Sequence, residues 1–297
     1  MKNKILIFTR FSKKNGIGHL IRSQRLFNLL KKKFNCRFYI NKNNVFISNK
    51  LNQLENKTLI ILDFKIYQKK LILNKNNLFY ILFDQNKIKK RNLISINPLN
   101  LNADSFFNGP RWFIFPKNFL RAKKKKTFKK KFKIFISQGG TDSNNNLKKI
   151  IRSLNINDEK IDKVFVKIPK KNYVKIKHKK ISYYYKLNNL FNVLNKTDIA
   201  ISGCGNFSYE INFFKIPTIY ISNEAKEIVR GKKYKTKGIG KFYKINQLNK
   251  ALAELKFLMN NKKYYNNMVN KRKNMFKKDR LKSIDNLVSA IFKKNEF

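Results

Sequence analysis

The sequence predicts an α/β protein made of two domains, each built around a parallel β-sheet. Short apolar runs rich in Ile and Phe alternate along the chain with longer segments of helical period. This alternation is typical of parallel sheets that are covered by helices. The runs are continuously apolar rather than alternating, which is typical of strands buried on both faces. At 297 residues the chain is also longer than a usual single domain.

The elements follow from these runs in chain order. We expect strands at Lys4 to Phe8, Thr58 to Asp63, Leu78 to Phe83, Phe113 to Phe115, Phe132 to Ser137, Val164 to Ile168, Ile199 to Ser202 and Thr218 to Ile221. The segments of helical period predict helices at about 19 to 33, 144 to 154, 187 to 196, 206 to 215, 224 to 237, 246 to 261 and 264 to 293.

A basic stretch near the middle of the chain, RAKKKKTFKKK at residues 121 to 131, marks the expected domain boundary. A block of like charges does not pack, so we expect a solvated linker there. This gives an N-terminal Rossmann-like domain at residues 1–120, a linker at 121–131 and a C-terminal Rossmann-like domain at 132–297. The alternative is a basic loop within a single sheet.

The net charge of +53 would ordinarily indicate a nucleic-acid or membrane partner. Here Lys is spread over the whole chain together with Asn, Ile, Phe and Tyr, which favours a drift in base composition over a selected binding surface. We therefore expect no nucleic-acid partner, although the charge allows weak association with an anionic membrane surface.

The two distant cysteines, Cys36 and Cys204, form no disulfide or zinc pattern. No secretory signal or membrane-spanning run is visible, so we expect a soluble, cytoplasmic protein.

The first candidate site is NGIGHLIR at residues 15 to 22, between an expected strand and an expected helix. Gly16 and Gly18 allow a tight turn and a close approach of a ligand to the main chain. His19 and Arg22 are three residues apart at the helix start and should point to the same side. A histidine at a helix N-terminus is favoured in its neutral form, which can accept a proton. The third glycine of a dinucleotide motif would fall at Ile21, so that function is excluded; a capping or packing role for His19 is the alternative.

Two further candidate sites also follow expected strands, where open α/β sheets bind ligands. In SQGGTD, residues 137 to 142, Gly139, Gly140 and Thr141 offer amide and hydroxyl donors to an anion such as a diphosphate; an ordinary helix cap is the alternative. The third site comprises Ser202, Gly203, Gly205 and Asn206. Glu210, one helical turn later, can accept hydrogen bonds from two adjacent hydroxyls such as those of a ribose, or can be an ordinary solvated side chain. Asn223 follows the next strand, and we expect it to line the same site.

Together, NGIGHLIR, QGGTD and SGCGNFSYEINFFKIPTIYISNEAKE resemble the hydrolases of pseudaminic acid biosynthesis, which cleave UDP-2,4-diacetamido-2,4,6-trideoxy-β-L-altropyranose to UDP and the free sugar. The motifs occur in the family's order over nearly the whole chain. The resemblance implies the GT-B architecture, two facing Rossmann-like domains with a cleft between them, which the glycosyltransferase that makes lipid II shares. It also implies that the C-terminal helix crosses back to the N-terminal domain.

The resemblance further implies a role for each candidate residue. No second His, Cys or acidic cluster joins His19 in the sequence, so we expect a reaction without a protein-held metal and without a cofactor. His19 would be the general base that activates water against the anomeric carbon. The nucleotide would be held by Gly139, Gly140 and Thr141 at the diphosphate, by Glu210 at the ribose, and by Asn223 at the sugar or diphosphate. We expect a monomer that binds a UDP-sugar, with Gly16, Gly18 and Arg22 at the sugar side.

The chain departs from the family's pattern at three places. Arg10 stands where members carry an Asp after the first strand, Lys65 replaces a Tyr, and in GPRWFIFPKNF Trp112 and Pro116 replace a Tyr and an Arg. These changes affect the expected sugar pocket more than the UDP site. Two other functions stay open: a glycosyltransferase, which would use a sugar hydroxyl instead of water, and a non-catalytic nucleic-acid-binding protein.

Overall fold

The computed structural model divides the chain into two compact units, unit 1 (residues 1–114 and 278–297) and unit 2 (residues 115–277). It describes residues 3–11, 18–54, 58–64, 78–84, 91–98, 107–116, 119, 126–140, 142, 145–169, 173, 175–185, 190–222, 224–272 and 284–294. The last helix belongs to unit 1, as the resemblance implied for the C-terminal helix, whereas the sequence-based ranges, 1–120 and 132–297, kept it in the second domain.

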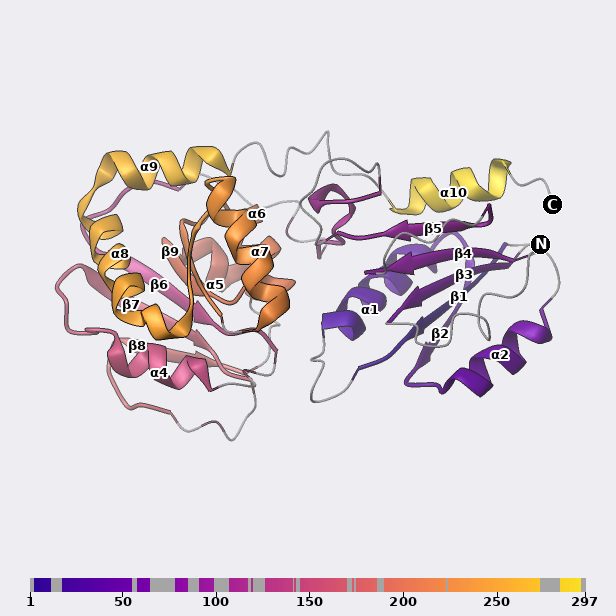
Figure 1. Cartoon of the computed structure of the whole chain (residues 1–297), viewed down its shortest axis with the longest axis horizontal. Helices are drawn as coiled ribbons and strands as arrows, with labels where there is room; N and C mark the ends of the chain where they lie inside the picture. Colours follow the sequence, from indigo (N-terminus) through magenta and orange to yellow (C-terminus); the bar gives the residue numbers. More distant parts are fainter. Residues whose placement is uncertain are drawn as a thin grey trace. The chain divides into compact units, whose positions relative to one another are not determined.

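Unit 1 has a five-stranded parallel sheet of order β2-β1-β3-β4-β5 with helices on both faces (Figure 1). Its elements are β1 (Lys4–Thr9), α1 (Gly18–Leu30), β2 (Asn35–Ile40), α2 (Asn44–Asn52), β3 (Thr58–Asp63), β4 (Phe79–Phe83), β5 (Leu93–Ile96), the 3₁₀ helix η1 (Pro110–Trp112) and α10 (Ile284–Lys294). The strand β1 has buried apolar residues on both sides, so both faces of the sheet must be covered by helices. Its Ile5 and Ile7 pack in the apolar cluster that includes α1 and α10, while Leu6 and Phe8 pack in the cluster that includes α2.

Unit 2 has a six-stranded parallel sheet of order β11-β10-β9-β6-β7-β8. Its elements are β6 (Phe132–Ser137), α4 (Asn146–Ser153), β7 (Ile161–Lys167), β8 (Ile181–Tyr184), α5 (Leu190–Lys196), β9 (Ile199–Ser202), α6 (Phe207–Phe213), β10 (Thr218–Ile221), α7 (Ala225–Thr236), β11 (Lys241–Tyr243), η4 (Ile245–Gln247), α8 (Leu248–Asn260) and α9 (Lys262–Lys271). Ile134 and Ile136 of β6 pack in the cluster with α4, α8 and α9. Phe135 points to the other face and contacts Phe207 of α6, with ring centroids 5.5 Å apart.

The described part of the basic stretch 121–131 packs on unit 2. Lys126 donates hydrogen bonds to the carbonyls of Leu194, Asn195 and Thr197 at the end of α5, at 3.1, 2.9 and 2.6 Å. The neighbouring Phe128 contacts the rings of Phe132 and Tyr265. Lys126 and Phe128 therefore pack on the unit, whereas Thr127 and Lys129 to Lys131 are exposed, as expected of a solvated basic stretch.

Most expected elements are confirmed, with two corrections. Residues 113–116 form no strand: η1 precedes them, and the apolar Phe113 and Ile114 are buried by packing, not by strand pairing. The single helix expected at 264 to 293 is two helices, α9 and α10, and residues 273–283 lie outside the described part. The sequence reasoning also missed β2, β5, β8, β11 and α2.

Candidate active site

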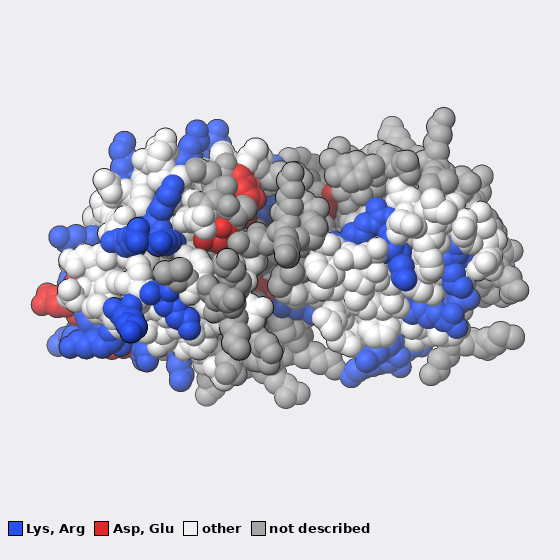
Figure 2. Space-filling view, turned by 90° about the horizontal axis from the view of Figure 1, so that it is seen from below, with Lys and Arg blue, Asp and Glu red and all other residues white. Residues whose placement is uncertain are grey.

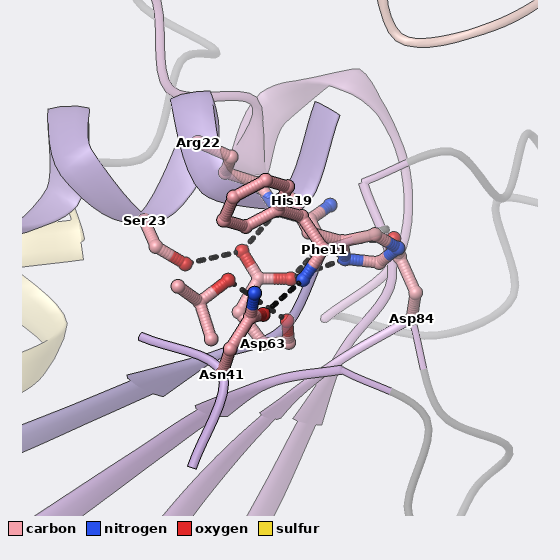
Figure 3. A network of polar contacts seen from close by, with 8 residues as sticks. Phe11, His19, Arg22, Ser23, Asn41, Asp63 and Asp84 are labelled. Atoms are coloured by element: carbon pink, nitrogen blue, oxygen red, sulfur yellow. Dashed lines mark hydrogen bonds and ion pairs between the residues drawn. The ribbon is translucent and has the colours of Figure 1, made fainter. Parts of the chain in front are cut away.

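A cluster of polar side chains lies at the carboxyl ends of β1, β3 and β4 in unit 1 (Figure 3). His19 is in the first turn of α1, Asp63 is the last residue of β3, and Asp84 follows β4 directly. Within the sheet, β2 and β3 lie on opposite sides of β1, so the chain reverses the direction in which it adds strands after β2. The cluster therefore occupies the topological switch point, where open α/β sheets bind ligands.

Asp63 is the centre of this cluster. Its side chain is fully buried and accepts hydrogen bonds at Oδ2 from Arg22 Nε at 2.9 Å and from Ser23 Oγ at 2.7 Å. Its Oδ1 contacts His19 Nδ1 at 2.7 Å and Arg22 Nη2. The same Arg22 Nη2 reaches Asp84 Oδ2 at 2.8 Å. One guanidinium thus holds carboxylates from two neighbouring strands.

The cluster is charged despite its burial. Burial alone would raise the pKa of Asp63, but Arg22 and then His19 outweigh it and hold that pKa well below its usual range. Burial acts to lower the pKa of Arg22, and the carboxylates of Asp63 and Asp84 keep it above its usual value instead. Both groups are therefore ionised at neutral pH, and Asp63 can act only as a hydrogen-bond acceptor.

This ionisation state fixes the tautomer of His19. A bare nitrogen lone pair 2.7 Å from a carboxylate oxygen would be repelled, so Nδ1 carries the proton and donates it to Asp63. Arg22 Nη2 also lies 3.1 Å from Nδ1, but a protonated Nδ1 accepts nothing from it. Nδ1 faces Asp63 in this tautomer, so the proton acceptor of the imidazole is Nε2, and 29% of the side chain is exposed. An oriented imidazole with a free Nε2 is the arrangement of a general base.

His19, Asp63 and Asp84 also form a group whose potential metal-ligand atoms lie within 4.8 Å of one another. Arg22 Nη2 contacts all three of these atoms. The guanidinium already supplies the positive charge that a metal ion would bring to this group. The geometry therefore fits an arginine-bridged acid pair better than a cation site.

The second group of candidate residues lies at the switch point of unit 2, on the loops that follow β6 and β9. Gly139 has φ +82°, which favours glycine, and apart from its chain neighbours no atom of the described residues lies within 4 Å of the position that a Cβ would take there. Buried Lys167, the last residue of β7, donates a hydrogen bond to the Gly139 carbonyl at 2.9 Å. Glu210 on α6 is 4% exposed, which excludes the solvated role.

The loop after β9 is closed by a carboxylate. The N–H of Cys204 donates to Glu227 Oε2 at 2.9 Å, and Arg230 on the same helix, α7, donates to the Cys204 carbonyl. A Cβ added to Gly203 or Gly205 would meet the Glu227 carboxylate at 3.0 or 2.9 Å. Burial raises the pKa of Glu227 above its ordinary value, against the hydrogen bonds that it accepts.

The structure thus brings together part of each predicted group. Gly18, His19 and Arg22 lie in the first turns of α1, and the two glycine-containing loops of unit 2 lie at adjacent strands, joined by a hydrogen bond from Gly203 N to Ser137 O at 3.0 Å. Three predicted residues lie outside the described part: Gly16, Thr141 and Asn223.

Sequence reasoning missed several residues of these sites: Ser23, Asp63, Asp84, Lys167 and Glu227. Asp63 and Lys167 carried a signal, because each is a charged residue at the carboxyl end of a buried apolar strand. Glu227 carried none, since acidic residues in the first turn of a helix are common.

On the face shown in Figure 2, Lys and Arg side chains are scattered over the described parts of both units. This distribution agrees with the dispersed lysines of the sequence. Within the described residues, no helix is both long and apolar enough to cross a bilayer.

No protein-family model matches the chain, and no curated protein matches its sequence. Its fold is nevertheless that of known structures. The calicheamicin glycosyltransferase CalG4 is 10% identical over all of both chains, with a TM-score of 0.64. MurG of Acinetobacter baumannii is 11% identical over 96% of this chain and 99% of its own, with a TM-score of 0.62. MnaA of S. aureus, solved with UDP, is 13% identical over 91% of each chain, with a TM-score of 0.59. The chain therefore has the two-domain GT-B fold.

Proposed function

We propose that this protein is a nucleotide-sugar hydrolase that cleaves UDP-2,4-diacetamido-2,4,6-trideoxy-β-L-altropyranose in a pathway of the pseudaminic acid type. The observation that carries the proposal is the 2.7 Å contact between His19 Nδ1 and the buried, ionised Asp63. It leaves Nε2 as a base at the ligand-binding edge of the sheet. The fold adds support, because structures that share it include a glycosyltransferase and a UDP complex.

In the proposed reaction, His19 Nε2 takes a proton from water as the water oxygen bonds to the anomeric carbon. The bond between that carbon and the diphosphate oxygen breaks, and UDP leaves with the electron pair. Attack from the face opposite the leaving group inverts the anomeric centre. A positioned base of this kind contributes roughly 10²–10⁴-fold to the rate. Asp63 stabilises the imidazolium that forms, as the acidic partner does in other His–Asp pairs.

The proposal assigns the nucleotide to unit 2. The open space beside Gly139 and the amides of the loop suit a diphosphate, and the buried Glu210 suits the ribose hydroxyls. Asn206 Oδ1 and Gln138 Nε2 are buried without a hydrogen-bond partner among the described residues, so both can bond to a ligand. The Arg22 bridge is the reason to propose a metal-independent reaction.

A glycosyltransferase remains the second candidate, and one observation favours it. Ile40, Val45 and Phe46 are exposed in unit 1, between the end of β2 and the start of α2. Strand ends and helix starts of a parallel sheet share one edge, so this apolar surface lies on the edge that also carries His19. It could receive an apolar acceptor, which a hydrolase does not need.

The test is proton NMR of the purified protein with the UDP-sugar, in EDTA and without any acceptor. We expect free sugar and UDP from the wild type, and none from His19→Ala, which should still bind UDP in calorimetry. His178→Ala is the matched control: the chain's other histidine is on an exposed connection, bonded to Asn157, and its loss should leave turnover unchanged. A wild-type protein that binds the substrate and leaves it intact would contradict the hydrolase and favour the transferase.

A further inference from the structure

Lys167 is a buried cation for which the proposed reaction has so far no use. Its side chain is 6% exposed, and no other lysine among the described residues of this highly basic chain is buried. Drift in base composition does not explain a buried lysine, because removing an ammonium group from water is costly unless it is paired. Burial lowers the pKa of Lys167, and the Glu210 carboxylate acts against that shift. The fold therefore holds this charge at a specific place.

That place is next to the glycine loop after β6. Lys167 Nζ donates to the Gly139 carbonyl at 2.9 Å. In a trans peptide the carbonyl of one residue and the N–H of the next point in opposite directions. By fixing the Gly139 carbonyl, Lys167 turns the Gly140 N–H away from itself. No hydrogen bond joins that N–H to any residue in the described ranges.

The two loops at the switch point of unit 2 differ in the amides, space and charges that they offer to an anion. In the loop after β9, the Cys204 N–H already bonds to Glu227, and the carboxylate covers both flanking glycines. In the loop after β6, nothing among the described residues fills the space beside Gly139, the Lys167 ammonium bonds to the loop, and the Asp142 carboxylate already accepts from the N–H groups of Asn146 and Leu147. The loop after β6 therefore offers an anionic ligand an amide and a nearby cation, whereas the loop after β9 has its Cys204 amide and the space at its glycines taken by a carboxylate.

We propose that Lys167 is a positioning residue that makes the Gly139–Gly140 turn the diphosphate-binding part of this site. It holds the Gly140 N–H toward the ligand and supplies a fixed positive charge beneath the loop, which stabilises the diphosphate as it leaves. This inference rests on the proposed function for the identity of the ligand, but the residue and the loop follow from the geometry alone. Hydrogen bonds to charged groups are the stronger ones in proteins, so the effect should be large.

The test compares Lys167→Met, Lys167→Arg and the control Lys163→Met, which lies near the opposite end of the same strand. Calorimetry measures binding of UDP, inorganic pyrophosphate and uridine. We expect Lys167→Met to weaken UDP and pyrophosphate binding by roughly 10- to 100-fold. Its uridine binding should be unchanged, Lys167→Arg should recover part of the loss, and Lys163→Met should behave as the wild type.

Equal losses for UDP and uridine in Lys167→Met would show a merely structural role and overturn the inference, as would unchanged affinities. A wild type that does not bind pyrophosphate would also overturn it. The proposed hydrolysis fails separately: pyrophosphate binding that depends on Lys167, without release of sugar from the UDP-sugar, would keep the inference and reject the hydrolase.

Discussion

Asp63 accepts hydrogen bonds from His19, Arg22 and Ser23, so its replacement should affect both catalysis and stability. Asp63→Asn removes the carboxylate that fixes Nδ1–H and allows the wrong tautomer of His19. We expect turnover of the UDP-sugar to fall by about 10³–10⁴-fold. The unfolding free energy should fall by about 3–5 kcal/mol, because Arg22 loses its buried partner. Steady-state kinetics and urea unfolding measure the two effects.

Asp84→Asn is the matched control for this prediction. Asp84 bonds to Arg22 and makes no hydrogen bond to His19. Its replacement should reduce stability while leaving the tautomer of His19 fixed. Equal losses of turnover in the two variants would contradict the role assigned to Asp63.

Asp142, which accepts hydrogen bonds from the N–H groups of Asn146 and Leu147, gives unit 2 a pH-dependent stability. Burial raises its pKa to about 6, against those hydrogen bonds. Between the ordinary pKa and this value the folded state binds more protons than the unfolded state, so the unfolding free energy falls as pH rises through this window. The loss is at most about 3 kcal/mol and is complete above pH 6 or so.

We therefore expect Asp142→Asn to gain stability relative to the wild type when the pH is raised from 4 to 7.5. Urea unfolding at both pH values measures this difference, and the constant loss of a capping oxygen cancels from it. Asp162→Asn, at an exposed position of β7, is the control and should show no such gain. A difference between Asp142→Asn and wild type that does not change with pH would contradict the prediction.

At this residue scale the sequence pointed to His19 and Arg22 but not to the carboxylates around them. His19 and Arg22 were found because they share one short motif whose glycines and helix start are visible locally. Asp63 is 44 positions from His19, and only the pairing of β1 with β3 brings the two together. Side chains that meet through sheet pairing leave no local pattern.

At the scale of elements, the missed strands are the weakly patterned ones. The strand β2 is an edge strand of mixed polarity and partial exposure, and β11 has only three residues. Central strands such as β3 are buried at every position and were predicted, because continuous burial demands a continuous apolar run.

The contact between α7 and β11 depends on Gly231. A Cβ added there would lie 2.1 Å from Cδ2 of Phe242, so the Phe242 ring or the backbone around it must shift to admit any larger residue. Alanine favours a helix over glycine by about 1 kcal/mol, but overpacking costs about 1–3 kcal/mol. We expect Gly231→Ala to lower the unfolding free energy by about 1 kcal/mol or more.

The double variant Gly231→Ala with Phe242→Leu separates these effects in chemical unfolding. A smaller side chain at position 242 should relieve the clash, so the alanine should stabilise in this background. An alanine that destabilises equally with Phe or Leu at position 242 would place the strain elsewhere.

At the scale of the whole molecule, the resemblance of the motifs predicted the GT-B fold correctly, because each motif marks a strand end and their order marks two sheets. The boundaries of the two units were harder to predict from the sequence. Unit 1 includes α10, whose Ile284, Val288 and Ile291 pack in one cluster with Ile5 and Ile7 of β1. The periodicity of α10 predicts an apolar face but does not say which of two sheets that face covers; only the resemblance implied that it returns to the N-terminal domain.

The place of α10 also sets an order of folding during synthesis. Unit 2 is one continuous stretch of chain, residues 115–277, and all of it is synthesised before the residues of α10. The sheet of unit 1 is synthesised first, yet one face still awaits the helix that residues 284–294 form. The part of the protein that is made earliest is therefore the part that is finished last, and until then it exposes an apolar surface that a chaperone could bind.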